Sequence, residues 1–253
     1  MDIHICDDPD ALARQAAYEF VRLANLAINR TGRFTVALGG GNTPRRLYET
    51  LASDVYRAQV LWSNVEFFWG DERCVPPDHA DSNYRMAHEA LLSKVDVDSA
   101  LIHRMKGEMA DASAAADEYE SVLRDRFELT DGKLPRFDLI LLGMGDDGHT
   151  ASLFPGTAAI HEAQRMVVGH FVPKLGVNRI TLTPPVLNGA FEVFFLINGA
   201  SKAEVLQSVL QGEFQPDVYP SQIVQPQKGR LVFLLDRAAA ALLDITPPEE
   251  QSR

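Results

Sequence analysis

The sequence predicts a single α/β domain over residues 1–253, with a doubly wound, mainly parallel sheet and helices on both of its faces. The main observation is that short apolar runs alternate with amphipathic stretches along most of the chain. Each run is continuous and bounded by Gly, Asp or Pro, which is typical of strands buried on both faces. Because parallel strands need a crossover segment between them, the alternation indicates the doubly wound arrangement.

Two segments carry helix patterns. Asp8 followed by Pro9 is typical of an N-cap and a first helical residue. Apolar side chains then recur at helical spacing, at Leu12, Ala16, Phe20, Leu23 and Ala27. The second predicted helix is 112–127, with Tyr119, Val122 and Leu123 on one side.

Seven apolar runs are predicted as strands. Five of them are expected in the parallel sheet, namely 34–38, 65–69, 137–142, 191–197 and 230–235. Two further strands, 166–172 and 179–183, have no assigned place in that sheet. The last residues, 246–253, are predicted as a tail.

Composition limits the classes of partner. Hydrophobic residues make up 46% and charged residues 23% of the chain, which is typical of a folded globular protein. The formal net charge is −11, so binding to nucleic acid or to an anionic membrane is not expected. An anionic ligand would therefore need a local cluster of basic side chains.

Cysteine usage and the chain start point to the cytoplasm. Cys6 and Cys74 are too few for a disulfide scaffold or a cysteine-based zinc site. The first ten residues lack the basic end and apolar centre of a signal peptide, and no apolar run has the length of a membrane span.

A glycine-rich loop follows the strand 34–38. Glycines at 39–41 let backbone N–H groups approach a ligand closely, and Thr43 and Pro44 begin a helix whose N-terminus favours an anion. The pattern matches neither a dinucleotide fingerprint nor a Walker A loop.

Arg45 and Arg46 lie in the first turn of that helix, where they oppose the helix dipole. We therefore expect an anion to compensate at least one of them. The alternative is a tight turn with solvated arginines.

The strand 65–69 ends at Gly70 and is predicted to release Asp71, Glu72 and Arg73 into a long loop. Asp71 is a candidate for orienting sugar hydroxyls, and Arg73 for clamping a phosphate or carboxylate. The alternative is an ion pair among these three residues.

The most informative stretch is 139–156. A strand ends at Gly143, and a glycine-rich turn places Asp146, Asp147 and His149 beside a predicted helix start at 150–152. A histidine next to a carboxylate holds one tautomer and can abstract a proton near neutral pH. One histidine with two aspartates is weak support for a metal, so none is expected.

Lys202 follows the strand 191–197 after a short loop, with Ser201 as the predicted N-cap of a helix. A cation in a first helical turn is unfavourable unless an anion accompanies it. The alternative is a surface lysine. Together with Arg73, Arg45 and Arg179, Lys202 is a candidate for a phosphate pocket.

These stretches resemble a known family. LGGGNTPRRLYETLA, FFWGDERCVP with SNYRM, LILLGMGDDGHTASLFPG and INGASKAEVL are similar to the 6-phosphogluconolactonases of the pentose phosphate pathway. The resemblance extends in the same order from about residue 8 to residue 240. The wider superfamily also includes glucosamine-6-phosphate deaminases and the sugar-sensing domains of repressors.

Two positions favour the lactonases within that superfamily. Arg73 follows Glu72, where the deaminases usually have Tyr. Phe154 lies five residues after His149, where the deaminases carry a Glu that assists ring opening. A deaminase-isomerase and a non-catalytic sugar-phosphate sensor stay as alternatives, although no basic helix-turn-helix is evident.

The resemblance implies a Rossmann-like fold of the glucosamine-6-phosphate deaminase type, and hydrolysis of 6-phospho-D-glucono-1,5-lactone to 6-phosphogluconate without a cofactor or metal. It implies that His149 is the general base and that Asp147 orients it, with Asp146 as the alternative. Backbone N–H groups of the glycine loop, or of the turn around Gly148, would stabilise the oxyanion. The implied substrate contacts are Gly40, Gly41, Asn42, Thr43, Arg45, Asp71, Arg73, Arg179 and Lys202. The only implied partner is the sugar phosphate, bound by a monomer or small homo-oligomer.

Overall fold

The computed structural model describes residues 1–244, so the predicted tail at 246–253 lies outside the described residues. The main sheet has six strands, and every pair of neighbours in it is parallel. Its order is β1 (Asp2–Cys6), β9 (Arg230–Asp236), β8 (Glu192–Ile197), β5 (Leu139–Leu142), β2 (Phe34–Leu38) and β3 (Val65–Trp69). The predicted doubly wound α/β fold is confirmed. Only β1 was missed, because it is an edge strand whose residues are mostly exposed.

A second, antiparallel sheet was not predicted. Its order is β4 (Asp71–Arg73), β7 (Val177–Leu182) and β6 (Val167–Val172). The predicted loop at Asp71–Arg73 is therefore wrong, because these residues pair with Arg179–Thr181. The two strands without an assigned place form the β6–β7 hairpin of this sheet.

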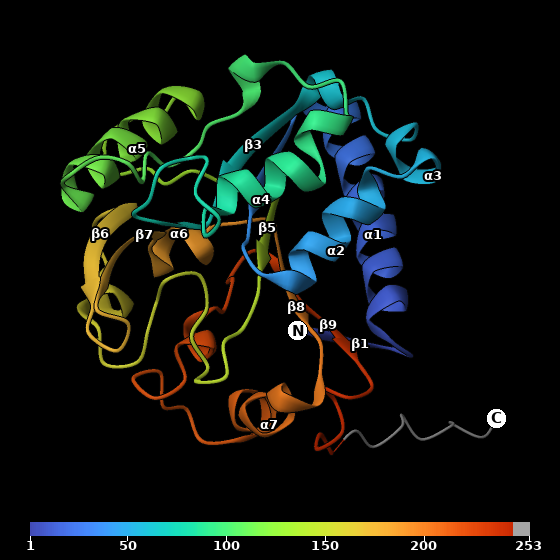
Figure 1. The fold of residues 1–253 in the computed structure, drawn as a ribbon, viewed down its shortest axis with the longest axis vertical. Helices are drawn as coiled ribbons and strands as arrows, with labels where there is room; N and C mark the ends of the chain where they lie inside the picture. Colours follow the sequence, from blue (N-terminus) through green and yellow to red (C-terminus); the bar gives the residue numbers. More distant parts are fainter. Residues whose placement is uncertain (245–253) are drawn as a thin grey trace.

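The helices lie around both sheets (Figure 1). They are α1 (Pro9–Thr31), α2 (Asn42–Leu51), α3 (Asp54–Arg57), α4 (Asn83–Ala90), α5 (Ala112–Arg126), α6 (Pro184–Leu187) and α7 (Ala203–Gln211). Short 3₁₀ helices occupy Trp62–Asn64, Leu92–Lys94, Ser99–Leu101, Ala158–His161, Ala200–Lys202 and Pro220–Ile223. Among residues 1–244, no helix is both long and apolar enough to span a membrane.

The start of α1 is as predicted. Asp8 accepts a hydrogen bond from the Ala11 N–H at 2.7 Å, Pro9 is the first helical residue, and the predicted apolar face is buried. The predicted helix at 112–127 matches α5 to within one residue.

Two other helix starts were predicted wrongly. No helix begins at 150–152, because the Thr150 hydroxyl donates to the Gly143 carbonyl and the Ser152 N–H to Thr181, which holds this segment as a turn. Ser201 is not an N-cap; it lies inside a 3₁₀ turn, and α7 begins at Ala203.

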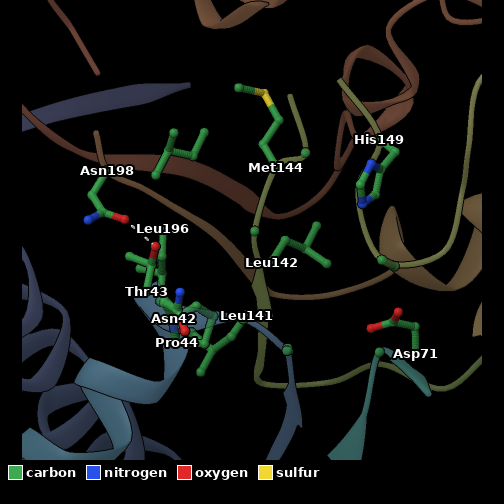
Figure 2. A pocket seen from close by; sticks show the side chains of 18 of the residues that line it. Asn42, Thr43, Pro44, Asp71, Leu141, Leu142, Met144, His149, Leu196 and Asn198 are labelled. Carbon is green, nitrogen blue, oxygen red and sulfur yellow. Dashed lines mark hydrogen bonds between the residues drawn. The ribbon is translucent and has the colours of Figure 1, made fainter. Parts of the chain in front are cut away.

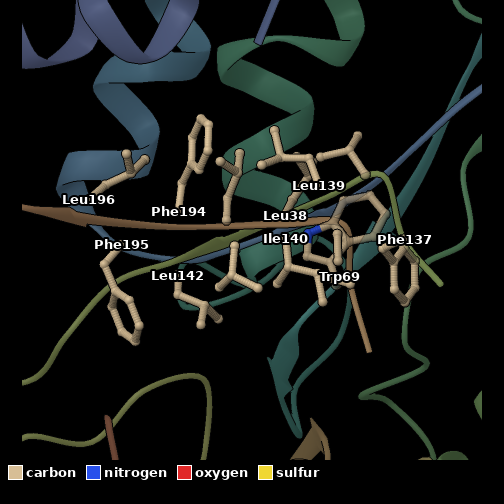
Figure 3. Close-up of a cluster of buried hydrophobic side chains, with 14 of the residues drawn as sticks. Leu38, Trp69, Phe137, Leu139, Ile140, Leu142, Phe194, Phe195 and Leu196 are labelled. Atoms are coloured by element: carbon tan, nitrogen blue, oxygen red, sulfur yellow. The ribbon is translucent and has the colours of Figure 1, made fainter. Parts of the chain in front are cut away.

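Both faces of the main sheet are buried. Phe194 and Phe195 are neighbours in β8, so their side chains point to opposite faces, yet both are almost fully inaccessible. Figure 3 shows Phe194 on the side of the helices and Phe195, with Leu142, on the other side. A sheet covered in this way holds its strand ends at fixed positions, and those ends carry the candidate functional residues.

Two buried tyrosines fix the ends of neighbouring strands. The Tyr48 hydroxyl, from α2, donates to the Gly39 carbonyl at 2.8 Å and accepts from the Gly39 N–H at 3.0 Å. The Tyr119 hydroxyl, from α5, accepts from the Trp69 N–H at 2.8 Å and donates to its carbonyl at 3.3 Å. Each hydroxyl thus satisfies a backbone donor and acceptor where a strand leaves the sheet.

Replacement of Tyr48 by Phe is expected to lower the free energy of unfolding by about 1–3 kcal/mol, because it leaves two buried polar groups of Gly39 without partners. Urea denaturation measures this loss. Tyr18→Phe is the matched control, because Tyr18 is exposed. Equal stability of the two variants would contradict the role given to the Tyr48 hydroxyl.

Candidate active site

A cavity lies where the strand order of the parallel sheet reverses, and we call it the main cavity after the main sheet that it borders. From β2 the chain passes to β3 on one side, and later to β5 on the other side. The loops after β2 and β5 therefore diverge, which is where open α/β sheets bind ligands. A cavity of about 400 Å³ lies here, lined by the segments 39–44 and 141–145 together with Asp71, His149, Asn198 and Lys202. Figure 2 shows Asp71 and His149 on one side of it and Thr43 and Asn198 on the other.

The glycine loop brings the backbone close to its neighbours. A Cβ atom on Gly40 would lie 2.0 Å from Oδ1 of Asn83, whose amide donates to the backbone carbonyl of Asp71 at 2.9 Å. Within residues 1–244, the N–H groups of Gly40 and Gly41 donate to no protein acceptor. Both residues line the cavity, so these donors are available to a ligand.

His149 is held by a carboxylate. Its Nδ1 lies 2.5 Å from Oδ1 of Asp147, and its ring stacks on Phe154 with a centroid distance of 4.0 Å. A Cβ on Gly145 would lie 2.0 Å from His149 Nδ1, so only glycine permits this arrangement. Because Asp147 engages Nδ1, Nε2 is the ring nitrogen left for a substrate or water.

Asp147 is ionised by its partners. Burial tends to raise the pKa of this carboxyl, but hydrogen bonds from His149 and Lys174 outweigh burial and hold the pKa well below its ordinary value. The Lys174 Nζ lies 2.5 Å from Oδ2 of Asp147. The carboxylate therefore contacts the imidazole with one oxygen and an ammonium with the other.

Asp71 lies at the junction of the two sheets. It is buried, and it accepts from the Ser152 hydroxyl at 2.7 Å and from the Asn83 amide at 3.2 Å. Its carboxylate still lines the cavity. Because each oxygen accepts only one of these bonds, both have lone pairs left for ligand hydroxyls.

Arg73 and Arg179 stand opposite each other in the β4–β7 pair. Burial and the nearby charge of Arg73 both lower the pKa of Arg179. In the part of the chain that the structure describes, neither guanidinium has a carboxylate oxygen within 4.0 Å; each donates to a backbone carbonyl, of Asp81 and Asn178. Two adjacent cations without a carboxylate indicate a site for an anion.

A second cavity of about 280 Å³ adjoins the main one. It shares Asp71, Arg73 and His149 with the main cavity and adds Arg179, Asp147 and Lys174. Lys202 faces the main cavity, with its Nζ 2.6 Å from Oδ1 of the exposed Asp146. Arg73 and Lys202 therefore line the main cavity, and Arg73 and Arg179 line the adjoining one; that they hold a phosphate stays a prediction.

Arg45 lines neither of these two cavities, but it lines a third one, of about 380 Å³, together with Gly41, Asn42 and Arg73.

Both arginines of the first turn of α2 have carboxylate partners within the protein. The Arg45 guanidinium lies 3.4 Å from Glu49 and 3.9 Å from Glu89, and Arg46 pairs with Asp10. The expectation that a bound anion compensates at least one of them stays a prediction.

The alternative reading of Asp71–Arg73 as a mutual ion pair is also wrong. The buried carboxylate of Glu72 accepts from the N–H groups of Asn83 and Tyr84, at 2.7 and 2.9 Å, and so caps α4. Arg73 is thereby left without a carboxylate partner in this segment.

Two residues near the site were missed by the sequence. Asn198 accepts from the Thr43 hydroxyl at 2.5 Å on one side of the cavity, as Figure 2 shows. It follows β8 directly, so its position at a strand end was a usable signal. Lys174 is far from Asp147 along the chain and carries no local signal. Within residues 1–244, no group of three or more His, Cys, Asp and Glu side chains is arranged to hold a metal ion.

Comparisons with known proteins agree with this geometry. The family model described as glucosamine-6-phosphate isomerases/6-phosphogluconolactonase matches residues 7–233. The chain is 48% identical to a 6-phosphogluconolactonase of Synechocystis sp. over 84% of this chain and 86% of that protein. It is 41% identical to a 6-phosphogluconolactonase of Nostoc sp. over 96% of this chain and 98% of that protein. The structure of the Trypanosoma cruzi 6-phosphogluconolactonase is similar, with a TM-score of 0.84, 32% identity, and coverage of 96% of this chain and 97% of that one.

The depressed pKa of Asp147 predicts a pH dependence of stability. Ionised Asp147 stabilises the fold above its ordinary pKa, near 3.8, and this contribution is lost as the pH falls below that value. Asp147→Asn is thus expected to be less stable than the wild type at pH 7 by about 1 kcal/mol after allowance for solvent screening. The difference should shrink at pH 3.

Urea denaturation at pH 7, 5 and 3 measures this difference. Asp146→Asn is the matched control, because Asp146 is exposed and contributes only a surface ion pair. A destabilisation by Asp147→Asn that is the same at every pH would contradict the assigned ion pair.

Proposed function

The chain belongs to the glucosamine-6-phosphate isomerase/6-phosphogluconolactonase family, and we infer that it is a hydrolase that opens 6-phospho-D-glucono-1,5-lactone to 6-phosphogluconate in the oxidative pentose phosphate pathway. The observation that carries this inference is one cavity system that holds a carboxylate-bound histidine and two arginines with no carboxylate partner among residues 1–244. The first suits water activation, and the second suits a phosphate.

Hydrolysis of a lactone makes modest chemical demands. A δ-lactone is an activated ester, so a positioned water and a base suffice. In our proposal Nε2 of His149 takes a proton from water as the water oxygen bonds to C1. Asp147 keeps Nδ1 protonated and stabilises the imidazolium that forms. The imidazolium then protonates the ring oxygen as the C1–O bond breaks, and the acid product ionises to release one proton.

The carbonyl oxygen of the lactone becomes an oxyanion in this step and needs donors. The N–H groups of Gly40 and Gly41 face the cavity without a protein acceptor within residues 1–244. The N–H of Gly148, in contrast, already donates to the Gly145 carbonyl at 3.1 Å. The glycine loop is therefore our preferred oxyanion site.

Binding of the substrate divides between two sets of groups. We assign the phosphate to Arg73, Arg179 and Lys202, which face the two adjoining cavities. The lone pairs of Asp71 suit sugar hydroxyls, and Asn42 and Thr43 line the same space. Arg45 is left out of this proposal because it lines neither of these two cavities.

Phe154 argues against the deaminase alternative. Its ring stacks on His149, at the position where the related deaminases carry a proton-relaying Glu. A hydrocarbon ring cannot assist ring opening, but it can restrict the tilt of the imidazole. Absence of ammonia release from glucosamine 6-phosphate would agree with this assignment.

We propose further that residues 1–253 act as one catalytic domain in the cytoplasm, as a monomer or small homo-oligomer without nucleic-acid or membrane partners. The net charge of −11 supports the last point.

Replacement of His149 by Asn is expected to lower kcat by about 10²–10⁴ with little change in KM, because the general base is lost while the polar side chain is kept. The assay follows proton release from freshly prepared lactone against the spontaneous rate, with and without a chelator. His161→Asn is the control, because His161 is exposed and pairs with Asp217 away from the main cavity. An unchanged rate would remove His149 from the mechanism.

Replacement of Arg73 or Arg179 by Ala is expected to raise KM for the phosphorylated lactone by about 10–100-fold, since each removes a charge-assisted contact worth about 1.5–3 kcal/mol. Unphosphorylated gluconolactone should not distinguish these variants from wild type. Arg45→Ala is the control and should leave KM unchanged. If the wild type hydrolysed both lactones equally well, the phosphate assignment would fail.

A further inference from the structure

One carboxylate of the site has two side-chain partners. Oδ1 of Asp147 accepts from His149, and Oδ2 accepts from Lys174 at 2.5 Å. In the described chain, Lys174 is the one lysine or arginine whose nitrogen lies within 4.0 Å of this carboxylate. The proposed reaction gives Lys174 no role, although it lines the same small cavity as His149.

Lys174 is held in place by the β6–β7 hairpin. It lies in the tight turn between the strands, where the N–H groups of Leu175 and Gly176 donate to the Val172 carbonyl at 3.1 and 2.9 Å. The body of the hairpin is fixed as well, because His170 of β6 bonds to the Ser152 carbonyl at 2.8 Å. The turn therefore presents the ammonium to Asp147 from a stable support, although the side chain itself is 63% exposed.

His149 and Lys174 both interact with the negative charge of Asp147. An imidazolium at His149 is stabilised by the negative charge of Asp147, and a fixed ammonium on the other oxygen offsets part of that charge. Removal of the Lys174 ammonium would therefore leave the full charge of Asp147 acting on His149. A general base must be unprotonated to accept a proton from water.

Other charges around His149 are part of the same balance. Asp71 and Arg73 come from β4, Arg179 from β7, and Asp146 and Lys202 from the loops after β5 and β8; Asp217 and Tyr219 line the cavity behind Asp147. Of these groups, none bonds to Asp147. Lys174 is thus the group whose removal changes the charge on the dyad most directly.

We propose that Lys174 is a positioning residue, and this inference rests on the proposed function. Lys174 fixes the Asp147 carboxylate on His149 and offsets part of the carboxylate's negative charge, so that the enzyme stays active to lower pH. The substrate is not bound by Lys174 in this view. Its effect is on the protonation of the base.

The test is the pH dependence of kcat from pH 4.5 to 8 for Lys174→Arg, Lys174→Met and Lys174→Glu. We expect Arg to match the wild type, Met to move the midpoint of the acidic limb upward by about 0.5–1 pH unit, and Glu to move it further. KM at pH 8 should change less than about twofold. The substrate phosphate also titrates near pH 6, but it is common to all variants and cancels in their differences.

Lys133→Met is the matched control, because it removes one positive charge from an exposed residue that lines none of the cavities described for residues 1–244. This variant should leave the midpoint of the acidic limb of the kcat profile unchanged. Circular dichroism at pH 5 and 8 checks that each variant is folded over the range measured.

The outcomes separate the two proposals. A wild type without lactonase activity removes the proposed function. An active wild type whose acidic limb is the same in all three variants overturns the inference about Lys174. A rise in KM of tenfold or more with an unmoved limb also overturns it, because Lys174 would then bind the substrate.

Discussion

The reversal of strand order between β2 and β5 is the constraint on which the site depends. From β2 the chain passes to β3 on one side and later to β5 on the other side, so the loops that follow β2 and β5 diverge. The cavity lies between those two loops. One loop supplies the backbone N–H groups of Gly40 and Gly41, which have no acceptor among residues 1–244, and the other supplies the His149–Asp147 pair. Burial of both sheet faces keeps the two loops at a fixed separation, because neither strand can move without disrupting the core.

The small antiparallel sheet supplies further residues to the site at the end of the parallel sheet. It places Asp71 at the cavity wall and sets Arg73 opposite Arg179, although these two arginines are far apart in the sequence. The β6–β7 hairpin also carries Lys174 to Asp147. In the proposed function, the two arginines that bind phosphate thus come from the small sheet, and the histidine that transfers the proton follows a strand of the main sheet. Contacts such as the Ser152–Asp71 hydrogen bond join the two parts.

Charge in this protein is organised locally. The chain as a whole is acidic, with a net charge of −11, and many of its arginines pair with carboxylates at the surface. Arg73 and Arg179 differ, since in the described residues they have only carbonyl partners. Their mutual repulsion and burial are unfavourable without a ligand, and a bound phosphate would relieve both.

The sequence by itself determined five of the six parallel strands, the helices α1 and α5, and the identity of His149, Asp147, Arg73 and Lys202 as candidates, because apolar periodicity and residues at strand ends are local signals. It did not determine β4, the separate sheet or the partners of Arg45, since these depend on pairing between distant segments. It could not reveal Lys174 either. Only the tertiary structure brings that ammonium to Asp147, because the sequence of a hairpin turn does not indicate which distant residue the turn will contact.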